Sequence, residues 1–155
     1  MLDLYDELIS VVSALSDRGI DYALCGGLAL AVYCEPRATV DIDLLVRPDD
    51  LEEAIGVVEP LGYTIEEPPM TFVHGAIEIR RISKPDPETG DALPLDLLLV
   101  SPEIVDVWDS RSQIQIERGA LWVVSLLGLI AMKSLRANSQ DMADIERLRE
   151  GLEYG

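Results

Sequence analysis

The sequence contains few residues that could build a thiolate metal site or a disulfide framework. Its two cysteines, Cys25 and Cys34, form no Cys-x-x-Cys pair, and His74 is its one histidine. The ligand count therefore excludes a zinc site of the usual cysteine and histidine type. We interpret both cysteines as small buried apolar side chains and His74, which precedes Gly75, as a surface turn residue.

Basic residues are scarce as well. The chain has 12 Lys and Arg against 29 Asp and Glu, a formal net charge of −17. Nonspecific binding to nucleic acid and binding to an anionic membrane both depend on Lys and Arg placed against phosphates, so this composition argues against both. The acidic residues are spread along the chain rather than collected in a tail, which is typical of a solvated surface.

Long apolar runs are missing too. No stretch reaches the roughly 18 apolar residues of a transmembrane helix, and the segment 1–7 is acidic where a secretory signal is basic. We therefore expect a cytoplasmic protein. The chain has 155 residues, of which 48% are hydrophobic, and it shows no repeat or linker. This length and composition predict a single domain over residues 1–155 with a sizeable core.

Apolar residues recur at helical and strand-like spacings in turn. The expected helices cover 2–18, 27–33, 48–59, 125–136 and 140–150, and another begins at Ser101 as its N-cap. The expected strands cover 20–25, 40–46, 63–65, 71–74, 76–82, 93–100, 113–117 and 121–124, and 84–91 is expected to be an exposed loop. This order predicts a mixed α/β (α+β) domain.

Three aspartates lie in segments that are otherwise apolar. Asp41 and Asp43 are two residues apart, so a strand would place both carboxylates on one face, where they repel each other unless a cation binds. Asp96 is the one charged residue of the expected strand 93–100. If the two strands are neighbours, the three carboxylates form a site for one or two Mg²⁺ (or Mn²⁺) ions. Asp41 and Asp43 would hold the metal ions. Asp96 would hold the second metal ion and orient or deprotonate an attacking hydroxyl.

Gly26 and Gly27 follow an apolar segment that ends at Cys25. Without side chains, such a pair lets the backbone approach a phosphate closely. A Gly-Gly pair or an Asp-x-Asp sequence is uninformative alone, but together they favour nucleotide chemistry. A calcium loop is excluded because residues 41–46 are too apolar and lack the later ligands.

The order of these elements resembles the signature of the nucleotidyltransferase superfamily related to DNA polymerase β. That signature is an apolar residue, Gly, then Gly or Ser, a spacer, Asp-x-Asp and a later acid. Here Cys25-Gly26-Gly27 is followed by a spacer of thirteen residues (28–40), Asp41-Ile42-Asp43 and then Asp96. The segments 27–30, 37–43, 129–136 and 140–145 are similar to a small bacterial branch with AbiEii-type toxin proteins and minimal nucleotidyltransferases. Gln140 stands where those relatives usually carry lysine.

The resemblance implies a nucleotidyltransferase fold, with a mixed central sheet flanked by helices and with C-terminal helices. It also implies Mg²⁺-dependent transfer of a nucleoside monophosphate from an NTP to a hydroxyl. Gly26 and Gly27 would then cradle the triphosphate at a helix N-terminus. Lys133 is a candidate phosphate or substrate contact, with an exposed helix face as the alternative. Arg37 and Thr39 could line the same pocket.

Two other functions stay open. The first is a toxin–antitoxin or regulatory protein, active or inactive as an enzyme, that acts mainly by binding a protein partner from a neighbouring gene; the acidic surface would suit a basic partner. The second is adenylylation of an antibiotic such as an aminoglycoside or a lincosamide. The acceptor hydroxyl, the preferred base and the oligomeric state are not encoded in any motif that we identify.

Overall fold

The computed structural model describes residues 1–34, 39–136 and 149. Its helices are α1 (Leu4–Asp17), α2 (Gly26–Tyr33), α3 (Leu51–Val58), α4 (Val105–Asp109) and α5 (Leu126–Arg136), with short 3-10 turns at Pro48–Asp50 and Glu59–Leu61. Its strands are β1 (Ala23–Cys25), β2 (Ile42–Val46), β3 (Ile65–Glu66), β4 (Met70–Phe72), β5 (Ile77–Pro85), β6 (Ala92–Leu99), β7 (Ser112–Ile116) and β8 (Gly119–Val123).

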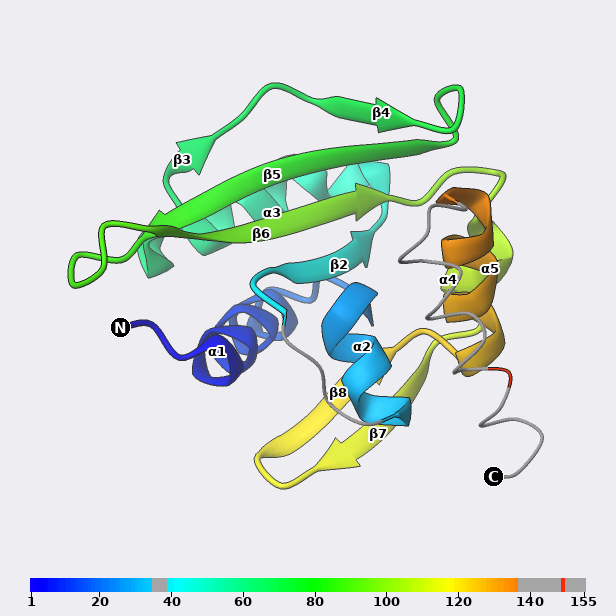
Figure 1. Ribbon diagram of the computed structural model, residues 1–155, viewed down its shortest axis with the longest axis horizontal. Helices are drawn as coiled ribbons and strands as arrows, with labels where there is room; N and C mark the ends of the chain where they lie inside the picture. Colours follow the sequence, from blue (N-terminus) through cyan, green and yellow to red (C-terminus); the bar gives the residue numbers. More distant parts are fainter. Residues whose placement is uncertain (35–38, 137–148, 150–155) are drawn as a thin grey trace.

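Within the described residues the strands form one mixed sheet in the order β3-β5-β6-β2-β1-β8-β7, and β4 pairs with β5 beside this path (Figure 1). β2 is parallel to β6 and antiparallel to β1, whereas β1 is parallel to β8. The central strands β1 and β2 are buried along almost their whole length, which explains why their sequences are nearly continuous apolar runs. The expected mixed central sheet is confirmed.

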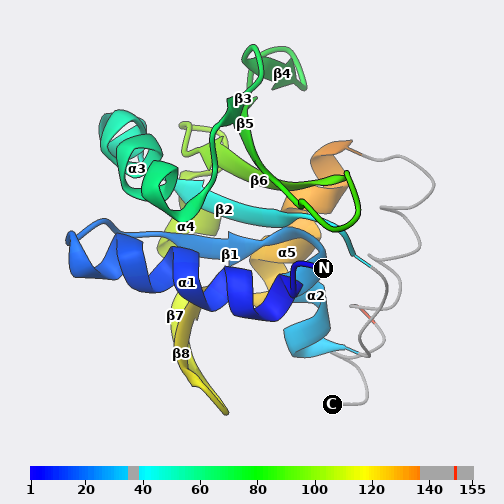
Figure 2. The same ribbon diagram turned by 90° about the vertical axis from the view of Figure 1, so that its left-hand side faces the viewer.

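Helices cover both faces of the sheet. Figure 2 places α1 and α3 on one side of the central strands and α2 and α5 on the other. α1 buries one stripe of apolar residues at helical spacing, and Asp3 caps it by accepting a hydrogen bond from the Asp6 amide at 2.9 Å. The stripe of α1 consists of Leu8, Val11, Val12 and Leu15.

α5 begins where the sequence predicts, because Ser125 caps it. The Gly128 amide donates to Ser125 Oγ at 2.9 Å. The next expected helix, 140–150, lies outside the described residues apart from Arg149, and so do Arg37 and Gln140. Among the helices that the structure describes, none combines the length and the apolar character needed to cross a bilayer.

The structure corrects several local expectations. Ser101 does not cap a helix: its hydroxyl donates to the Ala76 carbonyl at 2.7 Å, and α4 begins only at Val105. The loop 84–91 is not uniformly exposed, because β5 extends to Pro85 and the carboxylate of Asp86 is buried, accepting hydrogen bonds from the amides of Leu2 and Glu88. Local turn residues could not reveal the bonds to Ala76 and Leu2, which are distant in the sequence.

The thiols and the histidine were predicted with mixed success. Cys25 is buried, as predicted, but Cys34 is only half-buried because it ends the short helix α2 at the edge of the core. Both thiols are free. His74 lies in an exposed turn between β4 and β5, as predicted, with a φ of 53°.

Candidate active site

The start of α2 packs directly against β2. Cys25, the last residue of β1, pairs with Asp43 in the antiparallel register of the two strands. Gly26 has a φ of +68°, and a Cβ built on it would lie 2.2 Å from Asp43 Oδ2. A Cβ on Gly27 would lie 2.8 Å from Thr39 Oγ1. Because neither glycine has a side chain, Asp43 and Thr39 can pack against the first turn of this helix.

Three carboxylates converge beside that turn. The parallel register of β2 and β6 places Asp43 opposite Asp96, and Asp41 lies immediately before β2, although the sequence predicted it within the strand. One carboxylate oxygen from each aspartate lies within 4.8 Å of the other two. Asp96 is only 4% exposed, whereas Asp41 and Asp43 are partly exposed. The predicted convergence of the two strands is present.

Arg81 is a fourth member of this cluster, and sequence reasoning missed it. It lies on β5 opposite Asp96, to which its Nε and Nη2 donate at 2.7 Å and 2.9 Å. Its Nη2 also lies 3.8 Å from Asp41 Oδ2. The hydrogen bonds to Asp96 raise the pKa of the Arg81 guanidinium above its usual value, so Arg81 stays charged. The two adjacent arginines, Arg80 and Arg81, in a strand that is rich in isoleucine were the signal of a polar contact there.

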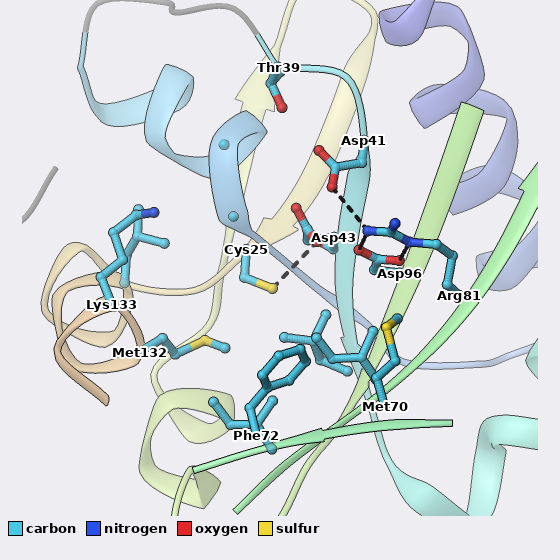
Figure 3. A pocket seen from close by; sticks show the side chains of 16 residues that line it. Cys25, Thr39, Asp41, Asp43, Met70, Phe72, Arg81, Asp96, Met132 and Lys133 are labelled. Atoms are coloured by element: carbon cyan, nitrogen blue, oxygen red, sulfur yellow. Dashed lines mark hydrogen bonds and ion pairs between the residues drawn. The ribbon is translucent and has the colours of Figure 1, made fainter. Parts of the chain in front are cut away.

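The cluster opens into a cavity of about 310 Å³ (Figure 3). Thr39 lies at one end of the view, Met70 and Phe72 at the other, and the three aspartates and Arg81 lie between them. Lys133 lines the cavity from α5 and is 8% exposed, so the alternative of an exposed helix face is wrong.

The Cys25 thiol also lines this cavity, and its Sγ donates to the Asp43 carbonyl at 3.6 Å. Burial first, and then the charge of Asp43, raise the pKa of the thiol well above its usual value. A thiol that stays protonated is a poor nucleophile, so Cys25 belongs to the packing of the site.

The donor set fits a hard divalent cation. Carboxylate oxygens are the ligands that Mg²⁺ prefers, and three of them lie close together at the wall of an open cavity. The single positive charge of Arg81 leaves an excess of negative charge among the three carboxylates, which a divalent cation would offset. Each carboxylate also keeps lone pairs beyond those that bond to Arg81.

No protein-family model and no curated protein matches the sequence. The fold, however, is that of solved nucleotidyltransferases. The lincosamide antibiotic adenylyltransferase LnuA, solved with lincomycin, superposes with a TM-score of 0.62 at 16% identity, covering 93% of this chain and 95% of its own.

ANT(2″)-Ia, solved with adenylyl-2″-tobramycin, gives a TM-score of 0.65 at 14% identity, over 95% of this chain and 88% of its own. A Thermotoga maritima protein gives 0.64 at 14% identity, over 97% of this chain and 93% of its own. The predicted nucleotidyltransferase fold is therefore confirmed. The narrower resemblance to the AbiEii-type branch stays a prediction.

Proposed function

We propose that the protein is a Mg²⁺-dependent nucleotidyltransferase that transfers a nucleoside monophosphate from an NTP to the hydroxyl of a small molecule. The observation that carries the proposal is the convergence of Asp41, Asp43 and Asp96 next to the glycine-opened start of α2, at the wall of an open cavity. The fold shared with solved nucleotidyltransferases supports it.

The residues divide into two groups by the charge that they can bind. Gly26 and Gly27 would offer backbone N–H groups at the N-terminus of α2, where a triphosphate is favoured, and Lys133 of α5 supplies a cation on the wall of the same cavity. Asp41, Asp43 and Asp96 would hold Mg²⁺, which neutralises the triphosphate and the pyrophosphate that leaves.

In the transfer step, the acceptor hydroxyl oxygen attacks the α-phosphorus, and the bond between that phosphorus and the pyrophosphate oxygen breaks. Asp96 is the carboxylate that accepts the hydrogen bond of the acceptor hydroxyl and orients its oxygen. Its two oxygens are already held by Arg81, which fixes the direction of the remaining lone pairs. The hydroxyl proton passes to Asp96 or to solvent as the new P–O bond forms.

Two observations favour a small acceptor over a nucleic-acid end. LnuA and ANT(2″)-Ia, which have the same fold, are solved with lincomycin and with an adenylylated tobramycin. The net charge of −17 would also repel a polyphosphate chain. The alternative of a protein partner from a neighbouring gene stays a prediction of the sequence.

The experiment is a labelling assay with Mg²⁺, each of four α-³²P-labelled NTPs, and a small-molecule fraction of a cell extract. We expect the label to move to a small molecule, and we expect this transfer to be lost in Asp43→Asn. Asp49→Asn, an exposed acid outside the cavity, should transfer normally. Absence of transfer with every NTP and extract, or full transfer by Asp43→Asn, would contradict the proposal.

A further inference from the structure

An apolar surface adjoins Asp96 on the same face of the sheet. Leu98 follows Asp96 by two residues on β6 and therefore lies on the same face of the sheet. Leu98 pairs with Ile79 of β5, just as Asp96 pairs with Arg81. On the other side of β5, the strand β4 adds Met70, which pairs with Ile79, and Phe72, which pairs with Ile77. We call this surface the apolar platform; it consists of Met70, Phe72, Ile77, Ile79 and Leu98.

The platform is part of the cavity wall and not only of the core. All five of its residues line the same cavity as the three aspartates. Ile77, Ile79 and Leu98 are buried and form its base, whereas Met70 is half-buried and Phe72 is 40% exposed. Leu129 and Met132 of α5 line the cavity as well, and Figure 3 shows Met132 facing the platform. The cavity therefore has one end lined by polar groups and one end lined by apolar groups.

The two ends suit different parts of the reaction. The polar end is formed by Gly27 at the start of α2 and by Thr39, whose side chain lies against Gly27; the proposed function places the triphosphate there. Asp96, which the proposed function places beside the acceptor hydroxyl, separates this end from the platform (Figure 3). A molecule that presents its hydroxyl to Asp96 from the opposite side to the triphosphate would rest on the platform.

We propose that the platform binds an apolar group of the acceptor and thereby places the adjacent hydroxyl at Asp96. This inference rests on the proposed function. The acceptor is then a small, neutral or cationic molecule whose reactive hydroxyl adjoins an aliphatic or aromatic group, and not a uniformly polar polyol. A negatively charged acceptor is disfavoured by the carboxylates of the cavity and by the acidic protein as a whole. Burial of its apolar group would supply the binding free energy.

The first test compares two neutral probes that share every hydroxyl, methyl β-D-glucoside and hexyl β-D-glucoside. Their dissociation constants are measured by NMR titration of the full chain with Mg²⁺ and a nonhydrolysable ATP analogue. We expect the hexyl probe to bind at least about tenfold more tightly, equivalent to about 1.4 kcal/mol. Equal affinities, or displacement of the hexyl probe by the ATP analogue, would overturn the inference, since displacement would assign the platform to the nucleobase.

A matched pair of variants tests whether the platform causes the preference for the hexyl probe. Phe72→Ser removes the exposed ring of the platform, and we expect the tenfold preference to fall to about threefold or less. Ile65→Ser is the control: Ile65 is 45% exposed on β3, which also pairs with β5, but it does not line the cavity. It should keep the full preference. An equal loss in both variants, or no loss in Phe72→Ser, would overturn the inference.

The affinity of the ATP analogue, measured in the same samples, separates the two proposals. Tight analogue binding without a preference for the hexyl probe would reject the platform and leave the proposed transferase intact. Failure of the wild-type chain to bind the analogue with Mg²⁺ would reject the transferase, and the acceptor site with it.

Discussion

Arg81 holds both carboxylate oxygens of Asp96, through donors at 2.7 Å and 2.9 Å, and its Nη2 lies 3.8 Å from Asp41. Burying a carboxylate costs free energy unless it is paired, and a guanidinium that binds both of its oxygens is a strong partner. The acid cluster therefore carries its own cation before any metal ion binds. This pairing offsets part of the repulsion among the carboxylates. From the sequence alone, we expected a metal ion to offset all of it.

Arg81→Met should destabilise the protein by roughly 3 kcal/mol without metal, because it leaves the buried Asp96 carboxylate unpaired. Added Mg²⁺ should restore part of this loss by binding the three carboxylates. Urea unfolding with and without Mg²⁺ measures both effects. Arg80→Met is the matched control, since the one ion pair of Arg80 among the described residues is with Glu78 at 3.8 Å, worth about 1 kcal/mol or less. Equal losses in the two variants would show that the pairing does not stabilise the cluster.

Gly26→Ala should reduce Mg²⁺ affinity by about tenfold or more. The new Cβ would lie 2.2 Å from Asp43 Oδ2, so Asp43 must move, and a φ of +68° itself costs an L residue about 1–2 kcal/mol. Isothermal titration with Mn²⁺ or Mg²⁺ measures the affinity. Gly56→Ala in α3 is the control, because no described atom outside the local backbone of the helix lies within 4 Å of its added Cβ, and alanine favours a helix by about 1 kcal/mol. Unchanged metal binding in Gly26→Ala would remove Asp43 from the metal site.

Lys133→Met should weaken binding of an ATP analogue by about tenfold or more, because a hydrogen bond to a charged group contributes about 1.5–3 kcal/mol. Methionine replaces the unbranched stem of lysine up to the ε position and suits the buried position on α5. Titration with the analogue, and separately with Mg²⁺ alone, should show a loss only for the analogue. If the analogue binds as tightly as to the wild type, Lys133 contacts no phosphate.

Stability should also fall at high pH because of Tyr63, which does not line the cavity. Its hydroxyl donates to Glu7 at 3.0 Å, and burial, followed by the charge of Glu7, raises the pKa of Tyr63. A folded-state pKa above the unfolded value gives stability that is complete below about pH 10 and is lost as the pH rises further. Urea unfolding at pH 9–11 should show a steeper loss for the wild type than for Tyr63→Phe. Parallel curves would contradict this reading.

Some residues of the candidate site could be predicted because burying them in an apolar segment costs free energy unless they have a partner. Charged Asp43 and Asp96 in apolar strands, and glycines at the start of a helix, stand out because only a ligand or a partner explains them. Their adjacency also followed from one assumption, that the two strands are neighbours, and the register of β2 and β6 confirms it.

Arg81 could not be predicted in the same way. Its partner is fixed by the register between β5 and β6, and Arg80 next to it points to the opposite face, so the sequence does not say which arginine meets the acids. The bonds of Ser101 to Ala76 and of Asp86 to Leu2 were missed for the same reason, since both depend on long-range packing. The apolar platform likewise emerges only when β4, β5 and β6 are in register.

The most direct test of the central claim is Mg²⁺-dependent binding of an ATP analogue to the double variant Asp41→Asn/Asp43→Asn, measured by isothermal titration. A matched double variant, Asp49→Asn/Glu52→Gln, removes two exposed acids outside the cavity and keeps the overall charge change the same. We predict that the wild type and the matched control bind the analogue only with Mg²⁺, and that Asp41→Asn/Asp43→Asn binds it at least about tenfold more weakly. Equal Mg²⁺-dependent binding by all three proteins would contradict the assignment of the site.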